Sequence, residues 1–279
     1  MTTQAPAPTH QTTTRSRLPR INRRAQFARR ARRADLLVTL LWASGAAAAA
    51  LYLAYGGASQ MTSVAGFITG LGILLGLVGT DFILVMLVLA ARIPLLDRTI
   101  GHDRAVATHR RLGKPALYLI LAHGVLLLIG YGMSTGFNPI AEIGPMLALP
   151  DMPLAFIGTG LLIAVVVTSL VAVRRKFSYE GWHLVHLLSY VAVAFALPHQ
   201  LSVGGVLAEG TVQRVYWIAL YVLAFGSILT FRFVEPIVAS LRHRITVAGV
   251  SQIAPGVTSI HLTGSKLRSL GTAGGRVDL

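Results

Sequence analysis

The chain has 279 residues, of which 54% are hydrophobic and only 13% are charged. This is more apolar sequence than one soluble core needs, so the composition is that of a membrane protein. The formal net charge is +15, and the chain contains no cysteine. The lack of cysteine excludes disulfides, thiolate metal sites, iron–sulfur clusters and cysteine nucleophiles, which leaves His, carboxylate or Met as metal ligands.

The first 34 residues are rich in Thr, Pro and Arg without apolar periodicity. We expect residues 1–34 to form a disordered, basic cytoplasmic tail. An arginine-rich arm is one way to bind nucleic acid. Beside a membrane span, however, such an arm is more often a topology determinant that lies on lipid, so we expect no nucleic-acid partner.

Six apolar segments are each long enough to cross the roughly 30 Å of hydrocarbon in a bilayer, which takes about 20 helical residues. The predicted spans are 36–56, 64–91, 115–133, 153–173, 182–200 and 212–233. The expected fold class is therefore an all-α membrane protein, with a six-helix transmembrane bundle in residues 35–235.

The basic residues orient these spans. If the N-terminus is cytoplasmic, Arg214 is the only one of the 25 Lys and Arg residues on the outside, where Glu142, Asp151 and Glu209 also fall. This pattern obeys the positive-inside rule. It predicts a multi-pass protein of the cell membrane with both termini cytoplasmic and with membrane lipid as a partner.

Five of the nine histidines fall on the third and fifth spans or at their ends: His109, His123, His183, His186 and His199. His109 and His123 are fourteen residues apart, about 21 Å and close to four turns of helix, so they share nearly one face. Both spans run in the same direction through the membrane. We therefore expect His109 to lie level with His186, and His123 to lie level with His199.

The fifth span fits this pairing less well. The thirteen residues from His186 to His199 make about 3.6 turns, which leaves the two side chains roughly 140° apart on an ideal helix. Pro198 removes a backbone donor just before His199, so we expect a kink or a wide turn there to re-aim the ring. His183 is no better in phase with His199, and we interpret it as a surface residue or as one that supports a ligand.

Two histidine pairs at matching depths are typical of two haems stacked across a bilayer, each with one axial ligand from each helix. The metal at His109, His123, His186 and His199 would then be haem iron, and ligation would offset the cost of burying the imidazoles.

Single intramembrane histidines also serve as hydrogen-bonding groups between helices or as proton relays. A haem-free channel or transporter with proton-coupled histidines is therefore the alternative. It would be expected to carry more intramembrane carboxylates or an internal repeat. Asp81, midway along the second span, is either a functional carboxylate or a protonated packing residue.

The stretch ARIPLLDRTIGHDRAVATHRRLG leading into ALYLILAH, and the stretch YEGWHLVHLLSYVAVAFALPHQ, resemble the transmembrane domain of ferric reductases and NADPH oxidases, in the form seen in actinobacterial reductases. That family has six spans. The third span carries two histidines with thirteen residues between them, and the fifth carries two with twelve residues between them. The four paired histidines occupy those positions, so the awkward phase on the fifth span is a family feature. The resemblance covers residues 36 to 270.

The resemblance implies an oxidoreductase that carries electrons from a cytoplasmic flavin through two haem b groups to an extracytoplasmic acceptor, either a ferric chelate or dioxygen. The haem held by His109 and His186 would receive electrons first. Arg92, Arg110 and Arg111 lie at a depth suited to the propionates of that inner haem, and a solvated or lipid-facing role is equally open for each.

After the last span, RITVAGV and VTSIHLTG flank a Pro-Gly turn and predict a β-hairpin. They resemble the first hairpin of the family's FAD-binding barrel, so we interpret residues 240–279 as the start of a truncated FAD-binding β-barrel domain. This hairpin argues against a close variant, a quinone-linked dihaem cytochrome.

The family's flavin motif and its glycine-rich loop for NAD(P)H are not found in the sequence. The resemblance implies FAD and NAD(P)H as cofactors, but their sites are missing from this chain. We therefore expect it to hold haem and to depend on a flavoprotein donor, either the rest of a longer reductase or a separate subunit.

Overall fold

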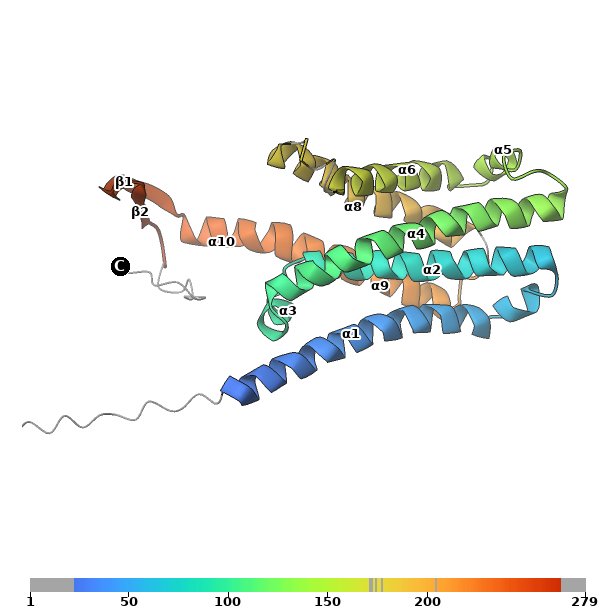
Figure 1. Ribbon diagram of the computed structural model, residues 1–279, viewed down its shortest axis with the longest axis horizontal. Helices are drawn as coiled ribbons and strands as arrows, with labels where there is room; N and C mark the ends of the chain where they lie inside the picture. Colours follow the sequence, from blue (N-terminus) through green and yellow to red (C-terminus); the bar gives the residue numbers. More distant parts are fainter. Residues whose placement is uncertain (1–22, 171–172, 174, 177, 204, 267–279) are drawn as a thin grey trace, which may run out of the picture.

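The computed structural model describes residues 23–170, 173, 175–176, 178–203 and 205–266 (Figure 1). Within these residues, six helices are long and apolar enough to cross a membrane. Five of them are α1 (Arg23–Ala54), α2 (Val64–Ala90), α4 (His102–Thr135), α6 (Met152–Ser169) and α8 (Tyr179–Ser202). The sixth runs from Val212 to His243. The expected all-α, six-span fold is confirmed, as an elongated bundle (Figure 1).

The sixth span is built from three consecutive pieces: α9 (Val212–Ile228), a π-helical turn (Leu229–Val234) and α10 (Glu235–His243). Short elements connect the spans: a 3₁₀ turn (Gly57–Gln60), α3 (Pro94–Thr99) and α5 (Ile143–Leu147). Three spans begin at a hydroxyl cap, because Ser63, Ser178 and Thr211 each accept a hydrogen bond from the backbone N–H three residues on.

Three spans extend beyond their predicted bounds on their basic sides, and the sixth span runs to His243 instead of residue 233. α1 begins at Arg23, so residues 23–34 are helical, and the expectation of a disordered tail is wrong for them; residues 1–22 lie outside the described part of the chain. α4 begins at His102 and continues through Pro115, which was the predicted start of its span. Hydropathy finds only the part of a helix inside hydrocarbon, whereas Ala, Arg and Leu favour helix on both sides of that boundary.

α2 packs against α4 through a row of glycines. A Cβ added at Gly72 would lie 3.2 Å from Leu126, and one added at Gly79 would lie 3.0 Å from Ile120. Small residues let membrane helices approach closely, since no side chain holds their backbones apart. The main apolar core is built around α2, with Phe82 and Leu84 packing near Trp217 of α9.

The C-terminal segment forms the expected β-hairpin. β1 (Thr246–Ala254) pairs antiparallel with β2 (Val257–Thr263) across a turn in which Gly256 has a φ of 78°. Most side chains of both strands are exposed. The hairpin is therefore a small sheet of two strands beyond the end of α10, apart from the bundle core (Figure 1).

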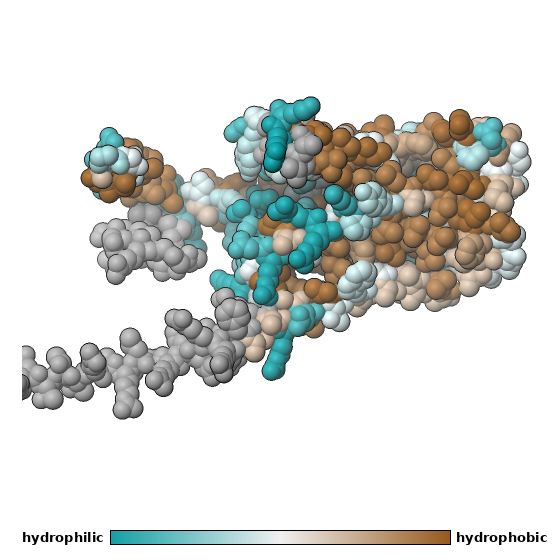
Figure 2. All heavy atoms as spheres, in the orientation of Figure 1, coloured by the Kyte–Doolittle hydropathy of each residue, from teal (hydrophilic) through white to brown (hydrophobic). Residues whose placement is uncertain are grey.

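Polar and apolar side chains are separated along the bundle. Figure 2 shows hydrophobic side chains over most of its length and hydrophilic ones gathered where α3 lies and α4 begins. We call this the basic end, defined by the exposed residues Arg92, Arg98, Arg104, Arg110 and Arg111. The band of apolar surface beside it is the part that membrane lipid would cover.

Candidate functional site

The first histidine pair joins α4 to α8 near the basic end. The ring centroids of His109 and His186 are 6.2 Å apart, and their planes meet at 66°. Two imidazole nitrogens that each lie about 2 Å from one metal ion place their ring centroids about 6 Å apart. The separation of these two rings therefore suits a single metal ion held between them.

The second pair joins the same helices farther from the basic end. His123 of α4 lies within electrostatic reach of His199 of α8, as His109 does of His186. Each helix thus supplies one imidazole to each of two levels. The structure thus brings His109 beside His186 and His123 within electrostatic reach of His199. His183 lies within electrostatic reach of His186 and stacks on Tyr179.

The two α4 histidines are oriented by backbone carbonyl groups of α2. Nδ1 of His109 lies 3.1 Å from the carbonyl oxygen of Met86, and Nδ1 of His123 lies 2.8 Å from that of Gly72. A carbonyl oxygen only accepts hydrogen bonds, so Nδ1 carries the proton in each ring. Nε2 is then the nitrogen with a free lone pair, which is the arrangement found in metal-bound histidines.

Gly76 of α2 makes room for the ring of His123. A Cβ added at Gly76 would come within 2.5 Å of the His123 ring nitrogen Nδ1 and within 2.8 Å of its Cγ. Only a residue without a side chain leaves room for the ring at this position. The sequence signal for this close contact was the run of glycines in α2, which is typical of close helix packing.

The two α8 histidines have weaker supports. Nδ1 of His186 lies 3.5 Å from the Ser169 hydroxyl of α6, which also accepts a hydrogen bond of 3.3 Å from the Trp182 indole. The Trp182 ring stacks on His186 at 5.1 Å. Nδ1 of His199 is buried near the carbonyl oxygen of Ala196, one turn back, without hydrogen-bond geometry to any described group.

Pro198 does not break α8. The helix continues past it to Ser202, where the backbone N–H of Val203 donates to the carbonyl of His199. The expected wide turn is therefore absent, and His199 lies within a continuous helix.

A small cavity of about 40 Å³ lies between the two levels. It is lined by residues of five helices, among them Ile120 of α4, Gly158 of α6, Val193 of α8 and Tyr221 of α9. Ile120 falls between the two histidines of α4 in the sequence, and Val193 falls between the two of α8. The space between the levels is thus small and lined mainly by apolar groups.

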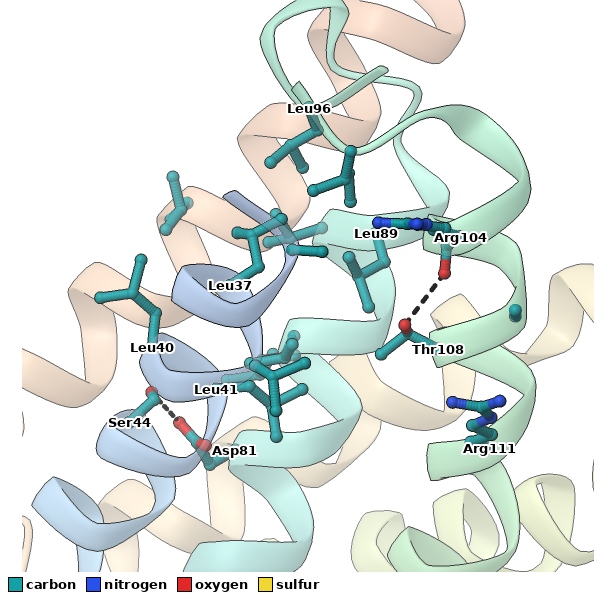
Figure 3. Close-up of a pocket in the computed structure, with 18 of the residues that line it drawn as sticks. Leu37, Leu40, Leu41, Ser44, Asp81, Leu89, Leu96, Arg104, Thr108 and Arg111 are labelled. Atoms are coloured by element: carbon teal, nitrogen blue, oxygen red, sulfur yellow. Dashed lines mark hydrogen bonds between the residues drawn. The ribbon is translucent and has the colours of Figure 1, made fainter. Parts of the chain in front are cut away.

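The expected propionate partners Arg92, Arg110 and Arg111 are all exposed, and none forms an ion pair with a described residue. Arg92 has a φ of 60°, a left-handed conformation, in the turn after α2. Arg111 lines a separate cavity, shown in Figure 3. The structure places these residues at the basic end but gives none of them a contact with the His109 and His186 rings.

Asp81 is completely buried in α2. One of its oxygens accepts a hydrogen bond of 2.6 Å from Ser44 of α1, and the Ser44 hydroxyl lies 3.3 Å from that of Tyr216 of α9. These contacts join three spans, which fits a packing role for this carboxyl group. Asp81 contacts neither histidine pair in the described structure.

Some contributors to the site escape analysis of the sequence. The carbonyl groups of Met86 and Gly72 belong to the backbone, which carries no residue signature, and Ser169 lies seventeen residues before the ring that it contacts. Its polar side chain near the end of an apolar span was the only available signal.

Residues 75–197 match the family described as "Ferric reductase like transmembrane component". The chain is similar to that family over this segment. No curated protein matches the chain. The ferric reductase-like segment includes three of the paired histidines, and His199 follows two residues after its end. This similarity implies oxidoreductase activity in general, and it is consistent with the candidate membrane-spanning helices of the bundle.

Proposed function

We propose that this ferric reductase-like protein carries electrons across the cell membrane through two haem b groups. His109 and His186 would ligate the inner haem, and His123 and His199 the outer one. The observation that supports this assignment is the pairing of imidazoles from α4 and α8 at two levels, with both α4 rings holding a proton on Nδ1. When bound, the haems supply one-electron redox chemistry.

The chain's own residues have three tasks in this proposal. The four imidazoles bind iron through nitrogen, and the Met86 and Gly72 carbonyl groups hold two of them in one orientation. The mainly apolar lining of the small cavity between the levels would disfavour water there. Arg92 and Arg110 would neutralise the propionates of the inner haem, since both are exposed cations at the basic end.

The charge distribution supports the direction of transfer. The basic end faces the cytoplasm under the positive-inside rule, so both termini are cytoplasmic and His109 and His186 form the entry level. Electrons would come from FAD and NAD(P)H on a flavoprotein donor, and they would leave to a ferric chelate or dioxygen outside. The β-hairpin after α10 lies on the donor side, where a flavin-binding domain would follow it.

A haem count tests the proposal. The wild-type protein in detergent should contain two b-type haems by reduced-minus-oxidised spectrum and pyridine haemochrome assay, and His123→Ala should contain one. His261→Ala is the matched control, because His261 lies on the exposed hairpin and should leave two. A wild-type protein without haem would overturn the proposal and favour the channel or transporter with proton-coupled histidines.

A further inference from the structure

A second, larger cavity lies at the basic end, apart from both histidine pairs. Its volume is about 550 Å³, within the range of small-molecule sites. Its walls come from α1, α2, α4 and α9, with one leucine from α3. Figure 1 shows the N-terminal part of α1 leaning away from α2 and α4, and the cavity occupies this wedge.

Most of the lining is aliphatic. The aliphatic lining includes Leu37 and Leu41 of α1, Leu84 and Val88 of α2, and Leu223 of α9. Such a space does not hold water well, because water needs polar partners that these side chains lack. Left empty, its walls would lose their dispersion contacts. Within a bilayer, the apolar matter available to fill it is a lipid chain.

Two arginines of α4 mark one side of the cavity. Arg104 and Arg111 are seven residues apart, two turns of helix, so they lie on the same face of α4. Figure 3 shows both side chains on the cavity side of this helix. Neither forms an ion pair with a described residue. Two guanidinium groups without a protein counter-charge form a site for an anionic headgroup.

Asp81 does not supply that counter-charge, although it also lines the cavity. Its carboxyl group is completely buried and accepts a hydrogen bond from Ser44 of α1 (Figure 3). Its second oxygen has no hydrogen-bond partner among the described groups. Asp81 and Ser44 therefore close the cavity opposite α4, and the charge of the two arginines stays available to a ligand.

We propose that this cavity binds an anionic phospholipid of the adjoining leaflet, with one acyl chain between α1 and α2 and the headgroup phosphate on Arg104 and Arg111. Charge complementarity selects the headgroup, and the aliphatic walls select the chain. The site is independent of haem, since none of its lining residues belongs to a histidine pair.

Native mass spectrometry of the purified full chain tests this site. The protein is offered phosphatidylglycerol, phosphatidylcholine or oleate, and the lipid that stays bound is counted. Wild type should retain one phosphatidylglycerol in preference to the other two. The double variant Arg104→Gln/Arg111→Gln should bind it about thirtyfold more weakly, because each arginine contributes to anionic-lipid affinity.

Lys114→Gln/Arg175→Gln is the matched control, because it removes two exposed cations that do not line the cavity. It should retain phosphatidylglycerol as wild type does. Ala107→Trp, which fills the cavity from α4, should displace the lipid while both arginines remain. If Ala107→Trp does not fold, the double arginine variant still tests the proposal, because both arginines lie at exposed positions.

Three results would overturn the proposal. Equal retention of phosphatidylcholine would show that the arginines do not select charge. Retention of oleate alone would assign the site to a free fatty acid. An unchanged affinity in the double arginine variant would place any bound lipid elsewhere on the protein.

Discussion

The two helices that carry the paired histidines support them differently. On α4, His109 and His123 each have Nδ1 against a carbonyl oxygen of α2, and Gly76 makes room for the His123 ring. On α8, the Ser169 hydroxyl lies 3.5 Å from Nδ1 of His186, and Nδ1 of His199 has no hydrogen-bond partner among the described residues. Hydrogen bonds to α2 therefore orient both α4 histidines, whereas the hydrogen-bond support described for the α8 histidines is weaker.

The largest effect on haem content is expected from filling the space beside Gly76 that the His123 ring of α4 occupies. Gly76→Ala would place a methyl group 2.5 Å from Nδ1 of His123. The ring or the helix must then move, which destabilises the protein by about 1–3 kcal/mol and removes the outer haem. The haem count should fall from two to one. Gly124→Ala, where a Cβ meets nothing within 4 Å, should keep both haems.

A second prediction uses the protein without haem. His123→Leu deletes the hydrogen bond to Gly72 and should lower the free energy of unfolding by about 1 kcal/mol. His199→Leu removes a buried, unpaired nitrogen, so it should leave that free energy unchanged or raise it. Thermal unfolding of the haem-free variants in detergent, followed by circular dichroism, measures this difference in sign.

Equal destabilisation by these two substitutions would mean that α4 and α8 support their histidines equally. It would contradict the comparison without affecting haem ligation itself, since each variant should still lose one haem when the cofactor is supplied.

The smallest effect is expected at Pro198. Because α8 stays helical through this residue, Pro198→Ala adds a backbone donor without changing the course of the helix. It should leave the haem count at two and change the unfolding temperature by only a few degrees. Loss of the outer haem in this variant would show that the proline aims the His199 ring after all.

Hydropathy and residue spacing predict the six spans and the proximity of His109 to His186. They do so because bilayer thickness and helix rise are fixed lengths. Hydropathy does not predict the basic ends of α1 and α4, since helix there extends outside hydrocarbon. Ideal helix phase alone does not account for His199, which the structure places within electrostatic reach of His123.

The supports of the histidines could not be predicted for a different reason. The carbonyl oxygens of Met86 and Gly72 accept hydrogen bonds from His109 and His123 only when α2 packs against α4 in one register. That register depends on glycines whose effect is visible only in three dimensions. Ser169 likewise contacts His186 only because α6 ends beside the start of α8.

The stacking of Trp182 on His186 has an optical consequence. Trp182 is one of three tryptophans; Trp42 is 61% exposed on α1, and Trp217 is buried where it donates a hydrogen bond to Gln200. The Trp182 ring centroid lies 5.1 Å from that of His186, so a haem bound as proposed would lie close enough to quench Trp182 fluorescence through energy transfer. Tryptophan emission would thus report the loading of the proposed haem sites without an attached dye.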